Sequence, residues 1–493
     1  MTERTHDHRR WLVLATGALV GLIAGTLLAP RPPQLSAEVG GDPELAADAR
    51  SAAGDRMGLE RLVVARVADG EIVTAALGGG RPEQRFEIGS IAKVLTGALL
   101  ADLAAEGVVS LDEPVSALVP GVPFSDPNVA SITLQRLATH HSGLPRLIVS
   151  DPRDVIGVVT QNLGADPYFA QGPQAILDDA ASVSAGDPAY RYSNFGFALL
   201  GQALAARAQT PFAELLRERV LDPLGMDDTA ILSADEPLPE WAVPGRSAGG
   251  SARAPWRSTG YAPAGGAIWS TAGDLARLLA ATADGSAPGA EAAEPRTDAG
   301  DDGVRVGLGW ITSDKEGRAI TWHNGGTGGF SSFAGFDRAS GRGVVVLSAT
   351  SRNVDAVGWR LHGVEEDEPG PPLPLLGATV FLALVGGYTV VDGARARPAS
   401  ATRTPPDRVR AVGAAALGLL YLWIAWLIGP WDILPPVMWI ACVGLAGVGL
   451  ALLISRWRRL PALSAGSTFQ RASAVANLVI ALAVAGLVAS RLG

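Results

Sequence analysis

Apolar residues gather in five long runs, at residues 11–29, 375–391, 411–428, 437–454 and 472–490. Each run approaches the roughly 17 to 25 residues with which an α-helix crosses a bilayer. A single run of this kind would also fit a helix buried in a soluble core, but four nearly charge-free runs in succession favour a membrane. The pattern therefore predicts a four-helix, all-α transmembrane region over residues 375–493.

The first apolar run allows two interpretations. Arg9 and Arg10 precede it, and a secretory signal peptide also has a positively charged flank before an apolar core. The length of the run favours an uncleaved anchor, and the one candidate cleavage site, at residues 35–37, lies far downstream. Residues 1–30 are therefore predicted to be a membrane anchor or a signal peptide.

Between these runs the pattern changes to that of a globular domain. Apolar and polar positions alternate on both sides of Asp69-Gly70, which is typical of a β-hairpin, and a second hairpin is predicted to turn within residues 337–343. Residues 98–280 indicate mostly helix and loop. Strands at both ends with helices between them predict an α+β domain over residues 57–364, with a sheet assembled from both termini.

Three stretches have the composition of linkers or loops. Residues 31–56 are rich in Pro, Gly, Ala and charge, which predicts a tether. Residues 365–374 are interpreted as a second linker before the transmembrane region. Residues 284–303 are polar and rich in Ala, Gly and Asp, which predicts a flexible surface loop.

The composition disfavours several classes of function. Residues 11–391 carry 27 basic and 44 acidic side chains, so the soluble part should repel nucleic acid. The single cysteine, Cys442, lies within an apolar run, which excludes an intrachain disulfide and a thiolate metal site. The six histidines show no H-x-x-x-H or H-E-x-x-H spacing. We therefore expect no metal, no cofactor and no nucleic-acid partner.

The first candidate for chemistry is the stretch FEIGSIAKVLTG at residues 86–97, which contains Ser90 and Lys93. At this spacing the two side chains lie on one face of a helix, about a turn apart. Ser90 should stand at the helix N-terminus, where backbone N–H groups can hold an oxyanion. On its own the pair is more typical of a serine N-cap followed by an incidental lysine. However, the chain has only two lysines, Lys93 and Lys315, which favours a need for an amine that can lose its proton.

Two further motifs lie near the ends of predicted elements. Tyr-Ser-Asn at residues 192–194 precedes an apolar helical stretch, and His-Asn-Gly-Gly at residues 323–326 follows a strand-like segment. Taken singly, the first is an ordinary turn and helix cap, and the second is a glycine-rich turn with a core histidine. Their chemical meaning depends on their combination with Ser90 and Lys93.

Taken in order, S-x-x-K, Tyr-Ser-Asn and His-Asn-Gly resemble the active-site motifs of the penicillin-recognising serine enzymes. The whole of residues 57–362 is similar to the branch of class C β-lactamases, D-alanyl-D-alanine carboxypeptidases and related esterases. The resemblance is also carried by LATHHSGLP (137–145), DPLGMDDTA (222–230), PAGGAIWSTAGDLARLL (263–279) and GLGW (307–310). It implies a β-lactamase-like domain: an antiparallel sheet from both termini flanked by helices, plus a helical subdomain.

The sequence departs from class C β-lactamases at two of the motifs, which usually read Tyr-Ala-Asn and Lys-Thr-Gly. Ser193 replaces the alanine, and His323 and Asn324 replace the lysine and threonine. Histidine at the first position is also seen in carboxypeptidase-like and esterase members, whereas asparagine at the second is less usual. This change bears on how a substrate carboxylate would be recognised.

The resemblance implies a role for each motif residue. Ser90 is the nucleophile, and either Lys93 or Tyr192 removes its proton; the choice stays open, because both side chains have reference pKa values near 10. The N–H groups of Ser90 and Gly326 form the oxyanion hole. His323 takes the place of the lysine that positions Tyr192 and the substrate in other members. The expected substrate-binding residues are Asn194, His323, Asn324 and Gly325.

These motifs predict a membrane-bound serine hydrolase of acyl-enzyme type, acting on peptides, esters or amides related to the D-amino-acid ends of cell-wall peptides. Peptidase or esterase activity is favoured over efficient β-lactamase activity because of His323 and Asn324. A hypothesis from another functional class is a non-catalytic penicillin-recognising receptor that signals through its C-terminal helices. The intact catalytic motifs argue against this hypothesis. The expected partners are a small peptide, ester or β-lactam substrate and membrane lipid; the sequence identifies no protein partner.

The arginines predict an orientation, because arginine marks the cytoplasmic side in short loops. Arginines precede the first apolar run and lie within residues 392–410 and 456–471, whereas the loop at 429–436 has Asp432 as its only charge. The predicted arrangement has the N-terminus inside, the catalytic domain outside, four C-terminal spans and Gly493 outside. The predicted location is a bacterial cell membrane, multi-pass, with an extracytoplasmic catalytic domain.

Overall fold

The computed structural model describes residues 2–148, 161, 163–168, 171–395, 407–462, 472, 475–484 and 486. The chain divides into two compact units. One, here called the globular unit, contains Gln34–Ser247 and Ala252–Glu368. The other, here called the helical unit, contains Met1–Pro33, Ala248–Ser251 and Pro369–Gly493.

The globular unit contains both helices and strands. Its helices are α2 (Pro43–Ala53), α3 (Ala92–Ala105), α4 (Val115–Leu118), α5 (Pro127–Ala130), α6 (Leu134–Ala138), α8 (Pro173–Ser182), α9 (Asn194–Ala208), α10 (Phe212–Leu216), α11 (Ala272–Ala283) and α12 (Asp355–Leu361). Its strands are β1 (Val39–Gly41), β2 (Leu62–Ala68), β3 (Glu71–Leu77), β4 (Phe86–Glu87), β5 (Ala230–Ile231), β6 (Ile268–Ser270), β7 (Thr297–Asp298), β8 (Val304–Val306), β9 (Ile311–Lys315), β10 (Arg318–Gly326), β11 (Ser331–Asp337) and β12 (Gly343–Ser348). Its short 3₁₀ turns include η1 (Gly89–Ile91), η4 (Ala262–Ala264) and η5 (Ala290–Ala293).

Nine strands form one antiparallel sheet in the order β1-β3-β2-β12-β11-β10-β9-β8-β7. The N-terminal strand β2 pairs with the C-terminal strand β12, so that Val64 lies opposite Val346. The turn between β2 and β3 uses Asp69 and Gly70, whose φ angles of 52° and 79° are those of the predicted hairpin turn. The expectation of an α+β fold, with a sheet assembled from both termini, is confirmed.

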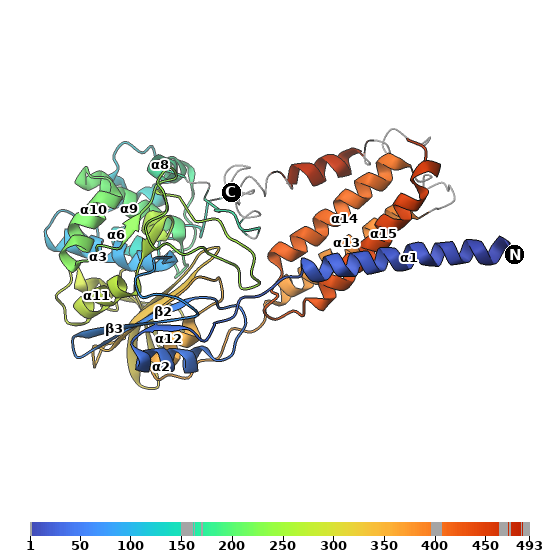
Figure 1. Cartoon of the computed structure of the whole chain (residues 1–493). Helices are drawn as coiled ribbons and strands as arrows, with labels where there is room; N and C mark the ends of the chain where they lie inside the picture. The colour runs from blue at the N-terminus through green and yellow to red at the C-terminus, as the bar shows by residue number, and fades with distance from the viewer. Residues whose placement is uncertain are drawn as a thin grey trace. The chain divides into compact units, whose positions relative to one another are not determined.

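Helices cover both faces of this sheet (Figure 1). On one face α2 and α12 pack over a buried cluster that includes Leu45, Phe333 and Trp359. On the other face α11 packs on the strands, and a larger cluster extends from there to α3 and α9. Every side chain at positions 92–101 of α3 is buried, because this helix is apolar on nearly all sides. It is the central helix of the unit, and Lys93 lies near its start.

The expected tether over residues 31–56 is wrong for most of its length. Residues 43–53 form α2, whose first turn is capped by Asp42, which accepts a hydrogen bond from the Leu45 N–H at 2.7 Å. The buried residues recur every three or four positions, at Leu45, Ala46, Ala49, Ala52 and Ala53. The alanines give this helix the composition of a linker, but they form the apolar face with which it packs on β2 and β3.

The expected flexible loop at residues 284–303 is also wrong. This segment contains η5 and the edge strand β7, and Ala292 and Ala293 are buried. A side-chain carbon at Gly289 would lie only 2.0 Å from the carbonyl oxygen of Ala98, so the segment packs directly on α3. Small apolar side chains of the segment are buried, while charged residues such as Glu291 and Asp301 stay exposed.

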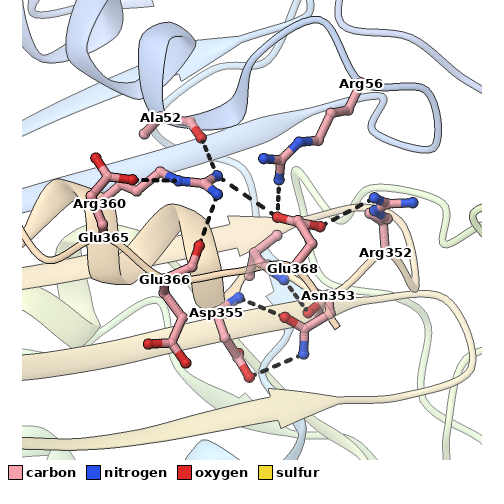
Figure 2. A network of polar contacts seen from close by, with 11 residues as sticks. Ala52, Arg56, Arg352, Asn353, Asp355, Arg360, Glu365, Glu366 and Glu368 are labelled. Carbon is pink, nitrogen blue, oxygen red and sulfur yellow. Dashed lines mark hydrogen bonds and ion pairs between the residues drawn. The ribbon is translucent and has the colours of Figure 1, made fainter. Parts of the chain in front are cut away.

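The two ends of the globular unit meet in a cluster of charged side chains (Figure 2). The Glu368 carboxylate forms ion pairs with three guanidinium groups, those of Arg56, Arg352 and Arg360. Arg360 also donates to the backbone oxygens of Ala52 at 3.0 Å and Glu366 at 2.9 Å. Residues 365–368 therefore belong to the globular unit, which corrects the linker predicted over residues 365–374.

Four helices of the helical unit are long and apolar enough to cross a membrane. They are α1 (Thr2–Leu27), α13 (Leu373–Ala394), α14 (Arg408–Ile428) and α15 (Val437–Arg456). Three of the predicted C-terminal runs are thereby confirmed as helices of spanning length. In the fourth run, at 472–490, the described part forms a shorter apolar helix, Val475–Val484, and the remainder lies outside the described residues.

α1 packs along α15 through glycine residues of both helices. Side-chain carbons at Gly17 and Gly21 would each lie 2.7 Å from a backbone oxygen of α15, those of Gly447 and Val443 respectively. Glycine permits this approach, as small residues do where membrane helices pack closely. α1 is thus an integral part of the helical unit.

Candidate active site

Ser90 lies at the start of the central helix. β4 leads through Ile88 into η1, whose second residue is Ser90, and η1 continues directly into α3. Gly89 has a φ of 51°, and a side-chain carbon there would lie 2.6 Å from the backbone nitrogen of Gly326. Both the backbone conformation and this close approach require glycine. The nitrogen of Gly326 therefore lies beside the Ser90 turn.

Lys93 lies one turn into the helix, where its amine reaches the Ser90 hydroxyl. The Lys93 Nζ is hydrogen-bonded to Ser90 Oγ at 2.9 Å and donates to the backbone oxygen of Ala264 at 2.6 Å. The side chain is fully buried. Burial, and secondly the charge of Arg146, lower the pKa of Lys93 well below its ordinary value. A neutral amine at this distance can take the serine proton.

Tyr192 and Asn194 flank Ser193, the N-cap of α9. The Ser193 hydroxyl accepts from the Gly196 N–H at 2.8 Å and donates to the backbone oxygen of Pro145 at 2.6 Å, which fixes the loop. Lys93 Nζ lies 4.9 Å from the centroid of the Tyr192 ring. Burial raises the pKa of Tyr192 above its ordinary value, although a hydrogen bond with Ser90 opposes this. Tyr192 therefore keeps its proton at neutral pH.

His140 supports this loop and is absent from the residues that the sequence predicted for the site. Its Nδ1 accepts a hydrogen bond from the Ser193 N–H at 3.1 Å, and its ring centroid lies 4.4 Å from that of Tyr192. Burial lowers the pKa of His140 well below its ordinary value, so the ring is neutral. The sequence feature that could have indicated His140 is the pair of histidines in LATHHSGLP. The sequence alone assigns no chemical role to that pair.

The end of β10 directs neighbouring side chains to opposite faces of the sheet. His323 is buried on the side of the site, with its ring centroid 6.3 Å from that of Tyr192. Its Nδ1 donates to the backbone oxygen of Asn324 at 2.5 Å. Burial, and secondly the charge of Lys93, lower the pKa of His323 to about 3. The histidine is therefore neutral and does not replace the charge of a lysine.

Two of the expected substrate-binding residues, Asn324 and Gly325, have different surroundings. The side chain of Asn324 donates from Nδ2 to Asp355 Oδ2, on α12, at 2.7 Å, because successive side chains of a strand alternate between its faces. Gly325 packs against the Ser90 turn, where a side-chain carbon would lie 2.0 Å from the Ile88 oxygen. The Asn324 side chain therefore faces α12, and the expected part of Asn324 and Gly325 in substrate binding stays a prediction.

A buried carboxyl group lies under the site. Glu87, on β4, is 2% exposed, and its Oε1 accepts from the backbone N–H of Trp256 at 2.6 Å. Within the described residues its Oε2 has no hydrogen-bond partner. Burial raises the pKa of Glu87 to about 8, although Thr327 and the Trp256 N–H favour the charged form. At neutral pH this group is mostly a protonated acid.

A cavity of about 120 Å³ opens beside Ser90. Its lining includes Ser90, Arg146, Tyr168, Asn194, Trp256 and Gly326. The Asn194 Nδ2 donates to the Tyr168 hydroxyl at 3.4 Å, while Asn194 Oδ1 has no partner among the described residues. That oxygen is therefore a buried acceptor without a partner in the described part of the chain. The cavity thus brings Ser90 together with the polar side chains of Asn194 and Arg146.

Comparison with known proteins agrees with this arrangement. The family model described as Beta-lactamase matches residues 49–365. The D-alanyl-D-alanine-carboxypeptidase/endopeptidase AmpH of Escherichia coli (strain K12) is 32% identical over 193 residues, which are 39% of this chain and 47% of that protein. The chain therefore spans about half the length of this relative.

Two solved structures resemble the chain at 22% sequence identity, a level that speaks for the fold alone. A class C beta lactamase from Rhodobacter sphaeroides matches with a TM-score of 0.53, over 64% of this chain and 97% of that one. A D-stereospecific amidohydrolase from Streptomyces sp. matches with a TM-score of 0.54, over 63% and 97%.

Proposed function

The chain belongs to the beta-lactamase family, and on that premise we propose that it is a serine hydrolase that forms an acyl-enzyme on Ser90. The observation that supports this most directly is the hydrogen bond of 2.9 Å between Ser90 Oγ and the fully buried amine of Lys93. A serine hydroxyl is a poor nucleophile until a neighbouring base takes its proton. Burial lowers the pKa of Lys93 well below its ordinary value, which favours the neutral amine that such a base requires.

In the proposed reaction Lys93 removes the hydroxyl proton as Ser90 Oγ attacks the substrate's carbonyl carbon. The backbone N–H groups of Ser90 and Gly326 stabilise the oxyanion that forms. Tyr192, which keeps its proton at neutral pH, donates it to the leaving group and regains one from Lys93. Water then hydrolyses the acyl ester and restores the hydroxyl. Lys93 is favoured over Tyr192 as the base because burial lowers the pKa of Lys93 and raises that of Tyr192. Burial therefore favours the proton-free form of the lysine and the protonated form of the tyrosine.

We further propose that the substrates are peptides, or related amides and esters, that end in D-amino acids. The name of one matched relative, a D-alanyl-D-alanine-carboxypeptidase/endopeptidase, supports this class. The unpartnered Oδ1 of Asn194 fits an N–H group of an amide substrate. The neutral His323 favours peptidase or esterase activity over efficient β-lactamase activity.

Mass spectrometry of the purified protein tests the proposal. The protein is incubated with a penicillin, a D-Ala-D-Ala peptide or a short-chain ester, and the mass of any covalent adduct and its lifetime are followed. We expect an adduct on Ser90 that turns over with the peptide or the ester and persists with the penicillin. Ser90→Ala should abolish every adduct, and labelling that persists in this variant would contradict the assignment.

We also propose that α1 is a retained membrane anchor and that the globular unit lies outside the cytoplasm. The packing of α1 on α15 through Gly17 and Gly21 supports retention, and the distribution of arginines supports the orientation. A reporter that is active only outside the cytoplasm should work when fused after Gly493 and fail when fused near Ser400. The intact mass of the purified protein should include residues 1–30.

A further inference from the structure

We propose that Arg146 binds a free carboxylate on the departing part of the substrate, so that the enzyme prefers to release a single C-terminal residue. The inference rests on the proposed acyl-enzyme function. It reassigns carboxylate recognition from the third motif, at Asn324, to a residue of the loop that follows LATHHSGLP.

The backbone of Arg146 is held by the second motif itself. Its carbonyl oxygen accepts hydrogen bonds from the N–H groups of Asn194 at 3.0 Å and Phe195 at 3.2 Å. The side chain lies over Tyr192, with its guanidinium carbon 5.2 Å from the ring centroid, a cation–π distance. The residue is exposed and lines the cavity that contains Ser90. Its position is therefore fixed at the backbone while its charged end remains accessible.

Arg146 is the one charged side chain among the described residues that line this cavity. The two other basic groups of the site, Lys93 and His323, are buried, and burial lowers the pKa of each, that of His323 to about 3. No acidic side chain of the described residues forms an ion pair with Arg146, and none lines the cavity. An anionic ligand entering the cavity would therefore meet a single permanent positive charge.

The place of this charge indicates which carboxylate it fits. Tyr192 is the proposed proton donor to the leaving nitrogen, and Arg146 stacks on the same ring. In a peptide cleaved before its last residue, the carboxylate is attached to the carbon next to that nitrogen. A guanidinium group can bind it through two parallel hydrogen bonds. An amide inside a longer chain has no such group, so the geometry favours release of the terminal residue.

The test uses the full-length chain in detergent with two matched substrates, an acylated D-Ala-D-Ala with a free C-terminal carboxylate and the same compound as its C-terminal amide. Arg146→Gln should lower kcat/KM for the free acid by about 10- to 100-fold, the worth of a charged hydrogen-bonded contact. It should change kcat/KM for the amide by less than about threefold. Arg146→Lys should fall between, because an ammonium keeps the charge without the planar fork.

The matched control is Arg191→Gln, which removes the same charge from an exposed arginine one residue before Tyr192. It should leave the ratio of the two rates unchanged. Arg146 also lowers the pKa of Lys93, so its loss could change the base. Such a change affects both substrates alike, and it therefore cancels in the ratio of the two kcat/KM values, which is measured at several pH values.

The outcomes separate this proposal from the one on which it rests. Suppose that the native protein forms a Ser90 adduct but that Arg146→Gln lowers kcat/KM equally for both substrates, or for neither. Carboxylate recognition by Arg146 is then overturned. If native protein forms no adduct with any substrate or penicillin, the acyl-enzyme function fails first. If Arg146→Gln still turns over the amide, the variant is folded. If it has at the same time lost activity on the free acid, the proposal is supported.

Discussion

Glu87 leads to a prediction about how the stability of the globular unit depends on pH. Its carboxyl group is 2% exposed, and burial raises its pKa from an ordinary value of 4.5 to about 8. Between these values the folded protein keeps a proton that the unfolded chain releases, so the free energy of unfolding falls as pH rises. The stabilisation is complete below about pH 4.5, and this group removes about 1.4 kcal/mol for each pH unit up to about 8.

Glu87→Gln removes this titration while keeping the shape of the protonated acid. The amide oxygen can still accept from the Trp256 N–H, as Glu87 Oε1 does. Relative to the native protein, the variant should therefore gain about 3 kcal/mol between pH 5.5 and 7.5, which is two units at 1.4 kcal/mol each. For a unit of this size that corresponds to a relative rise in Tm of about 4 °C.

The assay is thermal unfolding of the full-length native and variant proteins in one detergent, followed by tryptophan fluorescence at pH 5.5, 6.5 and 7.5. All other titrating groups are common to both proteins, so the difference in Tm isolates position 87. Glu83→Gln, at an exposed glutamate of the same segment, should give a difference that does not vary with pH. A constant difference for Glu87→Gln as well would refute the reasoning, because it would mean that the carboxyl group is charged in the folded protein throughout.

Three further predictions concern the site. Lys93→Arg should slow acylation of a chromogenic ester by roughly 10³-fold or more, because a guanidinium group cannot serve as the base; near-native bursts would move that role to Tyr192. His140→Phe should keep the ring stack on Tyr192 but leave the Ser193 N–H unpaired, so denaturant unfolding should show a loss of about 1 to 3 kcal/mol, and an unchanged midpoint would contradict the role given to Nδ1. Asn324→Thr should leave the ratio of rates on free-acid and amide substrates within about twofold, because Asn324 faces Asp355; a clear shift in that ratio would return position 324 to the substrate site.

The features predictable from the sequence were those encoded by local periodicity. The alternation around Asp69-Gly70 gave the β2–β3 hairpin, and the spacing of Ser90 and Lys93 gave two side chains that meet at the start of one helix. The Pro, Ala and Asp of α2 give it the composition of a linker, so composition alone does not indicate this helix. The cap at Asp42 and the period of Leu45, Ala49 and Ala52 already indicated an amphipathic helix.

Other parts of the site depend on contacts between distant segments. Arg146 reaches the cavity only because its backbone binds Asn194, and Glu87 is neutral only because the fold buries its carboxyl group. Neither relation has a signature in a single sequence. Asn324 is a different case, because the alternation of side chains along a strand places it on the face opposite His323, and this rule can be applied to the sequence alone.

The cluster around Glu368 bears on how the chain could be assembled or rebuilt. Gln34 pairs with Met57, next to Arg56, and Arg56 forms an ion pair with Glu368, so the first and last residues of the globular unit lie close together. The chain also leaves the globular unit after Ser247 and returns at Ala252, so four covalent connections join the two units. Ion pairs to Glu368 tie together the segment before β2 and the segment after α12, which gives the outer pair of these borders one common anchor.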